Sequence, residues 1–172
     1  MIDLRDLQHG QPGLSPEAGA FLTQAGAVCL ESQGHTSGDT LAVNGTLGGF
    51  AEELRWEPAT AQVRRTWNDL EEATEYGAVG IAILLVQRHT KHAVLKRARK
   101  GTGFDYWLGS ADRHPFQHKA RLEVSGLLKG TVSAIRTRVR QKVEQTKLSA
   151  RSLPAYVVVV EFGTPQCIVD QT

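Results

Sequence analysis

The clearest hydrophobic pattern in the chain lies in its last third. Apolar residues recur there at spacings of three or four, which places them along one side of a helix of about twenty residues. These residues are Leu128, Val132, Ile135, Val139 and Val143. Further on, the run AYVVVVEF is apolar at nearly every position. Such a run predicts a central strand that other layers cover on both faces.

A second helix is predicted to begin just after Trp67 and to end near Gln87. Asn68 or Asp69 can cap its start. Three acidic residues occupy its first turns: Glu71, Glu72 and Glu75. They suit the positive end of a helix dipole. Two glycines weaken this interpretation, and the run IAILLV inside the segment would equally suit a buried strand.

Three strands are expected after this helix. The first two span His92 to Lys100 and Gly103 to Leu108, with a glycine turn between them. The third is the segment ARLEVSG, which ends at Gly126. From Trp67 onward the order is therefore a helix, three strands, a helix and a strand. This order is typical of a mixed α/β or α+β fold with a mixed central sheet.

Residues 1–65 give weaker signals. Three short apolar pieces, at Ala27 to Leu30, Thr40 to Val43 and Leu54 to Trp56, are separated by glycine-rich turns and predict three short strands. We therefore expect a small β-rich N-terminal extension over residues 1–65 and a core over residues 66–172. A chain of 172 residues has about the size of one domain, so both parts are expected to form a single compact unit.

The net charge of +2 conceals a strong asymmetry. Residues 1–86 contain 4 Lys and Arg against 12 Asp and Glu, a net charge of −8. Residues 87–172 contain 16 Lys and Arg against 6 Asp and Glu, a net charge of +10. The chain therefore joins an acidic half to a basic half.

Two further features indicate the cellular compartment in which the protein is expected. Cys29 and Cys167 lie far apart and lack the CxxC spacing of zinc sites, so we expect buried thiols in a reducing compartment. No apolar run approaches the roughly 20 residues that cross a bilayer, and the first ten residues lack the pattern of a signal peptide. A cytoplasmic protein without membrane contact is expected.

Two carboxylates are predicted to meet on the central hairpin. Side chains alternate between the faces of a strand, so Asp105 and Glu123 each point away from the apolar face of their strand. If the two strands pair with both apolar faces toward one core, the two acids project from the same opposite face. Like charges at short distance repel unless one is protonated or a cation lies between them, and Mg²⁺ favours such oxygen ligands. The alternative is that both are solvated residues on the outer face of a hairpin.

With Asp in the second strand and Glu in the third, this order of elements resembles the core of the PD-(D/E)xK restriction-endonuclease-like superfamily. The resemblance covers roughly residues 67–162 and implies an αβββαβ nuclease core. It implies that Asp105 and Glu123 hold one or two divalent metal ions, Mg²⁺ or Mn²⁺, and that a glutamate of the first helix assists. Glu75 is the best match for this helical acid, with Glu71 and Glu72 as rivals.

The chain departs from the family pattern at one position. The resemblance implies a lysine two residues after Glu123, which would position or activate the attacking water, but Ser125 stands there. In one interpretation another cation replaces this lysine, either Arg121 on the same strand face or Lys142 or Lys147 from the following helix. In the other, catalysis is lost and the fold serves as a binding or scaffolding subunit.

Basic residues are the second sign of a nucleic-acid function. They border the apolar stripe of the long helix on both sides and crowd the first hairpin. Such clusters attract phosphate groups without reading the base sequence. The residues that we expect to contact nucleic acid are Lys100, Arg136, Arg140 and Lys147. The alternative is that these are solvated faces, or that they meet an acidic surface of this chain or of another subunit.

Aromatic residues and histidines near the hairpin are weaker signs of a binding site than the acids and the basic residues. Trp107 shares the strand face of Asp105 and could stack on a nucleobase, although a tryptophan beside two strands is more often packed under a helix. His114 and His118 have a spacing that binds zinc on a helix, but Pro115 lies between them and no cysteine accompanies the pair. We expect them to be loop residues.

We therefore expect a metal-dependent nuclease that hydrolyses phosphodiester bonds, with DNA favoured over RNA. Asp105, Glu123 and Glu75 would hold Mg²⁺ or Mn²⁺, and Arg121 or Lys142 would stabilise the developing charge. A chain of this size would need a protein partner or a second copy to choose its substrate, as in a prokaryotic antiviral-defence or DNA-processing complex. The alternative is a catalytically inactive subunit that keeps the nuclease-like fold to bind DNA or a protein partner.

Overall fold

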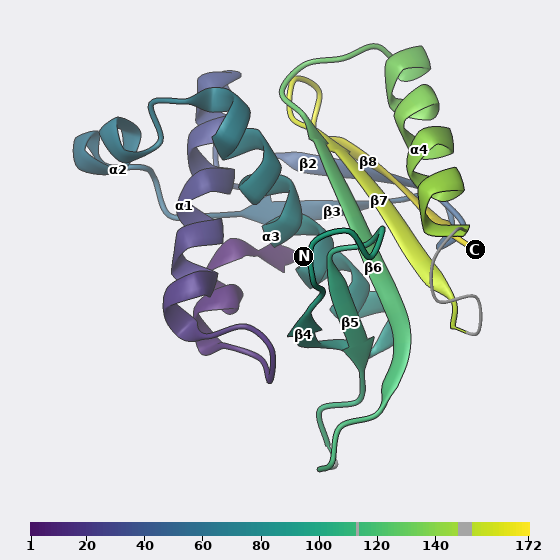
Figure 1. The fold of residues 1–172 in the computed structure, drawn as a ribbon. Helices are drawn as coiled ribbons and strands as arrows, with labels where there is room; N and C mark the ends of the chain where they lie inside the picture. The colour runs from purple at the N-terminus through teal and green to yellow at the C-terminus, as the bar shows by residue number, and fades with distance from the viewer. Residues whose placement is uncertain (113, 148–152) are drawn as a thin grey trace.

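A computed structural model describes residues 1–112, 114–147 and 153–172 (Figure 1). Within these residues, eight strands form one mixed sheet in the order β1-β3-β2-β8-β7-β6-β5-β4. In chain order the strands are β1 (Ile2–Asp3), β2 (Thr40–Gly45), β3 (Phe50–Arg55), β4 (Ala93–Arg97), β5 (Tyr106–Gly109), β6 (His118–Leu127), β7 (Ala155–Glu161) and β8 (Gln166–Gln171). The helices are η1 (Leu4–His9), α1 (Pro16–Ser32), α2 (Ala61–Thr66), α3 (Leu70–Thr90) and α4 (Val132–Lys147). The predicted mixture of helices with a mixed sheet is confirmed.

Helices cover both faces of the central strands (Figure 1). On one face, Leu122 and Val158 join the apolar residues of α1 and α3 in a single cluster. On the other face, Ile135 and Val139 of α4 pack against Val159. Because strand side chains alternate, the even-numbered residues of β6 and β7 point toward α3 and the odd-numbered ones toward α4.

The N-terminal segment differs from the expectation of three short strands. β2 and β3 overlap the second and third predicted pieces, but Ala27 to Leu30 lies inside α1, so the prediction of a strand there is wrong. The side chain of Ser15 caps α1, because its Oγ accepts the backbone N–H of Ala18, and Pro16 occupies the first turn of the helix. The helix crosses α3 closely, because a Cβ on Gly77 would lie 2.9 Å from the Cα of Gly26.

The remaining elements follow the predicted order. α3 is the helix expected after Trp67, and the side chain of Asp69 caps it by accepting the backbone N–H groups of Glu71 and Glu72 at 2.9 and 3.3 Å. The alternative in which IAILLV forms a strand is therefore wrong. β4, β5 and β6 are the three predicted strands and pair antiparallel in that order. β8, which the sequence did not predict, pairs with β7 and β2 and links the N-terminal strands to the rest of the sheet.

β6 and β7 run parallel, with Glu123 opposite Val157. Parallel neighbours need a crossover connection, and α4 forms the helical part of it. On the opposite face, Gly126 of β6 lies directly against α3, where a Cβ would overlap the carbonyl oxygen of Thr74. The absence of a side chain at position 126 therefore sets how closely β6 approaches α3.

The two cysteines are buried, as expected, and neither forms a disulfide. Burial raises the pKa of Cys29 to about 11 and that of Cys167 to about 12, so the reactive thiolate is disfavoured at both. None of the described helices has the length and apolar character that crossing a membrane requires.

Replacing Gly126 by alanine is expected to lower the free energy of unfolding by about 1–3 kcal/mol, because the new Cβ would press on the backbone of Thr74. This loss must outweigh the roughly 0.5–1 kcal/mol that alanine gains over glycine within a strand. Gly130→Ala is the matched control, since a Cβ there would lie 3.4 Å from the Leu127 side chain, an ordinary contact. Urea unfolding measures both variants. Equal stability of the two would contradict the close packing of β6 on α3.

Candidate active site

The antiparallel pairing of β5 and β6 brings Asp105 and Glu123 together. Tyr106 pairs with Leu122, and the backbone N–H of Asp105 donates to the carbonyl oxygen of Leu122 at 2.8 Å. Asp105 therefore lies just before β5 and beside Glu123. Asp105 Oδ2 accepts the backbone N–H of Val124 at 2.8 Å, and the two carboxyl groups lie close enough for each to affect the pKa of the other. The predicted meeting of the two acids is confirmed.

Burial changes the acidity of this pair. Glu123 is 2% exposed and Asp105 is half-buried, so the alternative of two solvated surface acids is wrong. Burial, followed by the neighbouring charge of Asp105, raises the pKa of Glu123 to about 7. Burial also raises the pKa of Asp105, although the Val124 N–H and the charge of Lys142 act in the opposite direction. The pair therefore retains a proton up to near neutral pH, which relieves the repulsion of two like charges.

Lys142 brings a positive charge to the pair from α4. Its Nζ lies 2.6 Å from Glu123 Oε1, and Gln145 Nε2 reaches the same oxygen at 3.3 Å. One turn earlier, Arg138 donates to Ser125 Oγ at 3.3 Å, at the position where the family pattern has its lysine. These three residues form one flank of α4 that faces β6. The shared flank of Arg138 and Lys142 was visible in the sequence, but the role of Gln145 was missed because a neutral side chain gives no charge signal.

The other cations suggested for the missing lysine are engaged elsewhere. Arg121 is buried, and its guanidinium donates to the carbonyl oxygens of Thr146 at 2.8 Å and Leu153 at 2.7 Å. It thereby ties the end of α4 to β6. Lys147 is exposed and pairs with a glutamate of its own helix at 2.6 Å. Of the three cations, Lys142 is the one that lies on the acid pair.

Asp105 and Glu123 are two adjacent carboxylates, the type of ligand that Mg²⁺ and Mn²⁺ take. Mg²⁺ is often held by one or two carboxylates while it keeps several waters, and these adjacent acids supply the hard oxygen ligands that it prefers. Among the described residues, no group of three or more His, Cys, Asp or Glu side chains could hold a metal ion. Glu75 is exposed on α3, on the opposite side of the sheet from Lys142, so it does not complete such a group.

Two of the four basic residues predicted to bind nucleic acid lie across α4 from the acid pair. Arg136 and Arg140 are exposed on the other flank of α4 and line a groove of about 760 Å³ against β8 and β2. Because β8 and β6 lie on opposite sides of β7, α4 separates this groove from Glu123. Lys147 is exposed at the end of α4, and Lys100 is exposed in the turn after β4. Arg136 and Arg140 therefore do not form one continuous surface with the acids.

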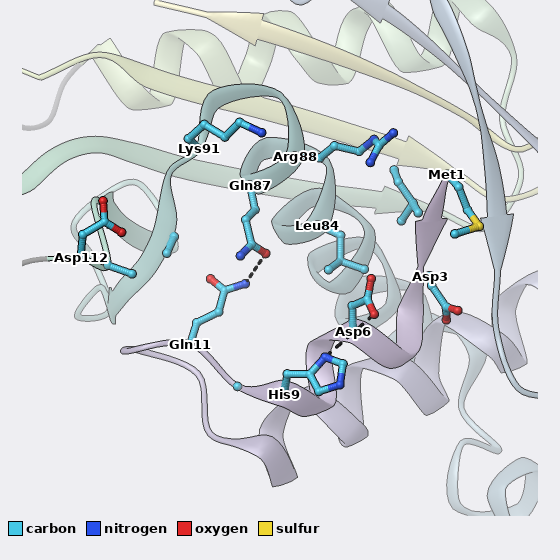
Figure 2. A pocket seen from close by; sticks show the side chains of 14 residues that line it. Met1, Asp3, Asp6, His9, Gln11, Leu84, Gln87, Arg88, Lys91 and Asp112 are labelled. Atoms are coloured by element: carbon cyan, nitrogen blue, oxygen red, sulfur yellow. Dashed lines mark hydrogen bonds and ion pairs between the residues drawn. The ribbon is translucent and has the colours of Figure 1, made fainter.

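A second cavity, of about 780 Å³, opens between η1, the end of α3 and the loop after β5 (Figure 2). Gln11 and Gln87 meet there, with Gln11 Nε2 donating to Gln87 Oε1 at 2.9 Å (Figure 2). His9 and Asp6 lie 3.9 Å apart at its edge, and both are mostly exposed. These polar groups pair with one another, so the acid pair remains the stronger candidate for chemistry.

Glu123→Gln is expected to raise the free energy of unfolding at pH 8 by on the order of 1 kcal/mol, because it removes a buried charge beside Asp105. The pKa of Glu123 is about 7 in the folded chain against an ordinary value of 4.5, so the folded state binds the extra proton. The contribution of Glu123 to wild-type stability is therefore fully present below pH 4.5 and is lost as the pH rises through 7. The advantage of the variant should shrink at pH 5, which urea unfolding at both pH values measures.

Glu161→Gln is the matched control. Glu161 is also buried and points to the same face, but it accepts the backbone N–H groups of Gly163 and Thr164 at 2.7 and 3.0 Å. These donors stabilise its charge, so the substitution is expected to lower stability at both pH values. Similar destabilisation by both substitutions at pH 8 would mean that Glu123 is an ordinary structural partner of Lys142.

Comparisons with protein-family models, with curated proteins and with solved structures found no match to this chain. The function proposed below rests on the acid pair, on Lys142 and on the strands that carry them.

Proposed function

We propose that this chain is a metal-dependent nuclease that hydrolyses a phosphodiester bond of DNA. The observation that carries the proposal is the pair of buried Glu123 and half-buried Asp105, with the ammonium of Lys142 2.6 Å from Glu123. Two adjacent carboxylates shielded from water disfavour their own ionisation, and such perturbed groups concentrate at sites of catalysis. Their partial shielding from water also strengthens the action of nearby charges.

The order and pairing of the strands support the proposal. α3 is followed by the antiparallel strands β4, β5 and β6, then by α4, and then by β7 parallel to β6. This arrangement resembles the αβββαβ core of the PD-(D/E)xK superfamily. Asp105 stands at the start of the second of these strands and Glu123 within the third, as the family pattern requires. Lys142 reaches the pair from α4, in place of the lysine that the resemblance implies at Ser125.

The residues of the chain would orient the reacting groups. Asp105 and Glu123 would hold the Mg²⁺ or Mn²⁺ ion, which would supply activation of a water molecule and positive charge for the phosphoryl group. The backbone N–H of Val124 fixes Asp105, and Gln145 and Lys142 fix Glu123, so both carboxylates are oriented before substrate arrives. Lys142 also keeps a positive charge near the oxygens that gain negative charge during attack.

A non-catalytic role is the second candidate, and the contacts of Glu123 favour it. Lys142 and Gln145 already engage Glu123 Oε1, and no third acid joins the pair within the described part of the chain. In this role the ammonium replaces a metal ion as the counter-charge, and the fold binds DNA or a protein partner. Titration calorimetry with Mn²⁺ separates the two roles: binding that Asp105→Asn and Glu123→Gln abolish supports the nuclease, and its absence supports the second role.

Cleavage of supercoiled plasmid and of single-stranded DNA, each with Mg²⁺ or Mn²⁺, tests the nuclease directly. Asp105→Asn and Glu123→Gln are each expected to lower the rate by about 100-fold or more, because either change removes half of the negative charge that would hold the cation. Glu75→Gln serves as a control and should leave the rate within about twofold, as expected for an exposed residue outside the pair. Equal rates in wild type and both acid variants would refute the proposal.

The role of Lys142 needs its own comparison. Lys142→Met is expected to lower the cleavage rate by about 100-fold, and Lys142→Arg should restore part of it by returning the charge. Lys147→Met is the matched control on the same helix, because its exposed ion pair with Glu144 contributes little. If both methionine variants cut at the wild-type rate, Lys142 has only a structural role.

A further inference from the structure

Trp107 differs from the other two tryptophans of the chain. Trp56 and Trp67 are buried, at 4% and 3% exposed, whereas Trp107 is half-buried. It stands in β5 two residues after Asp105, which places it about 7 Å along the strand and on the same face. α4 packs on β6, β7 and β8, so this part of the sheet lies beside the helix rather than beneath it. The indole is a partly open aromatic surface next to the acid pair.

Two rings hold the indole in place. The imidazole of His118 stacks on it, with ring centroids 4.4 Å apart and planes inclined by 10°. Phe104 meets it at 4.6 Å and 80°, and the guanidinium of Arg121 lies 5.8 Å from the centroid of the Phe104 ring. Phe104 is buried and fixes the orientation of the indole, whereas His118 is exposed and can be displaced.

One cationic side chain lies beside this aromatic surface, and another stands in the turn of the same hairpin. Lys96 of β4 pairs in register with Trp107, so its side chain leaves the sheet on the same face, and it is exposed. Lys100 is exposed in the turn that follows β4. Neither lysine forms an ion pair with any acid among the described residues. An oriented ring with the ammonium group of Lys96 beside it, and a second lysine in the adjoining turn, matches the sites that bind single strands, where rings stack on bases and cations contact phosphates.

We propose that Trp107 is a stacking site for one unpaired base of a single-stranded nucleic acid, which takes the place of the His118 imidazole. Lys96 and Lys100 contact the phosphates beside that base. Bases within a duplex already stack on their neighbours and do not offer a free face, so the site selects single strands. A strand bound there runs alongside Asp105. The inference rests on the proposed function, since it names the substrate class of that site, but the stacking itself requires no cleavage.

Binding of labelled strands to the full chain tests this inference, with fluorescence anisotropy measured in EDTA at one fixed salt concentration. The probes are a short oligothymidylate, an abasic strand of the same length and a duplex. Wild type is expected to bind the oligothymidylate at least about tenfold more tightly than the abasic strand, and the duplex no more tightly than the abasic strand. Because Trp56 and Trp67 are buried, quenching of the half-buried Trp107 indole by oligothymidylate gives a second readout.

The variants separate base stacking from phosphate contact. Trp107→Leu is expected to weaken oligothymidylate binding about tenfold and to leave the abasic strand unaffected, whereas Trp107→Phe keeps a ring and most of the affinity. His118→Ala uncovers the indole and should keep or increase the affinity. Phe21→Leu is the matched control, since Phe21 is another exposed aromatic residue, 42% exposed, on α1 at the opposite face of the sheet.

Three results would overturn the inference: no oligothymidylate binding by wild type, normal binding by Trp107→Leu, or an equal loss for the abasic strand. Because divalent cations are absent, the result is independent of cleavage. A wild type that stacks the base but never cuts DNA refutes the nuclease and leaves the stacking site standing. A wild type that cuts DNA while Trp107→Leu binds normally refutes the stacking site alone.

Discussion

The parallel pairing of β6 with β7 is the constraint on which the candidate site depends. Parallel neighbours cannot be joined by a tight turn, so the chain between them must cross one face of the sheet, and α4 lies in that crossing. The apolar stripe of α4 rests on Val159, which fixes the rotation of the helix. One flank then faces the odd-numbered residues of β6, where Lys142 and Gln145 reach Glu123. The cation is therefore placed by topology and not by its distance from Glu123 in the sequence.

Two buried glutamates on this face differ in the groups that surround their carboxylates. Glu161 lies at the end of β7, where backbone N–H groups surround its carboxylate and stabilise the charge. Glu123 has a second acid as its neighbour, and its pKa rises to about 7 because burial and Asp105 both disfavour its ionisation. The hydrogen bonds from Lys142 and Gln145 offset only part of this effect. Ionisation of the carboxyl group is therefore unfavourable at Glu123, whereas backbone donors surround the carboxylate of Glu161. Such unfavourable groups are common at sites where function opposes stability.

Features that depend on local patterns could be predicted from the sequence, and features that depend on distant partners could not. The meeting of Asp105 and Glu123 follows from strand alternation, and α4 follows from one apolar stripe. α1 was missed although a Ser-Pro start signal precedes it, because its glycines disfavour a helix until their packing partner is known. Gly26 makes sense only against Gly77 of α3. Likewise, Arg121 could be assigned to its strand face, but its carbonyl partners at the end of α4 are a tertiary feature.

The charge asymmetry along the chain separates helices that lie on opposite faces of the sheet. Residues 1–86, with a net charge of −8, supply α1 and most of α3 on one face. Residues 87–172, with a net charge of +10, supply α4 and the hairpin that carries Trp107. Exposed charges act over about 8 Å at physiological salt, so under the proposed function the basic half of the chain would attract the nucleic-acid substrate. Asp105 and Glu123 lie on the face that carries α4, where Lys142 and the raised pKa of Glu123 reduce the negative charge that a phosphate would meet.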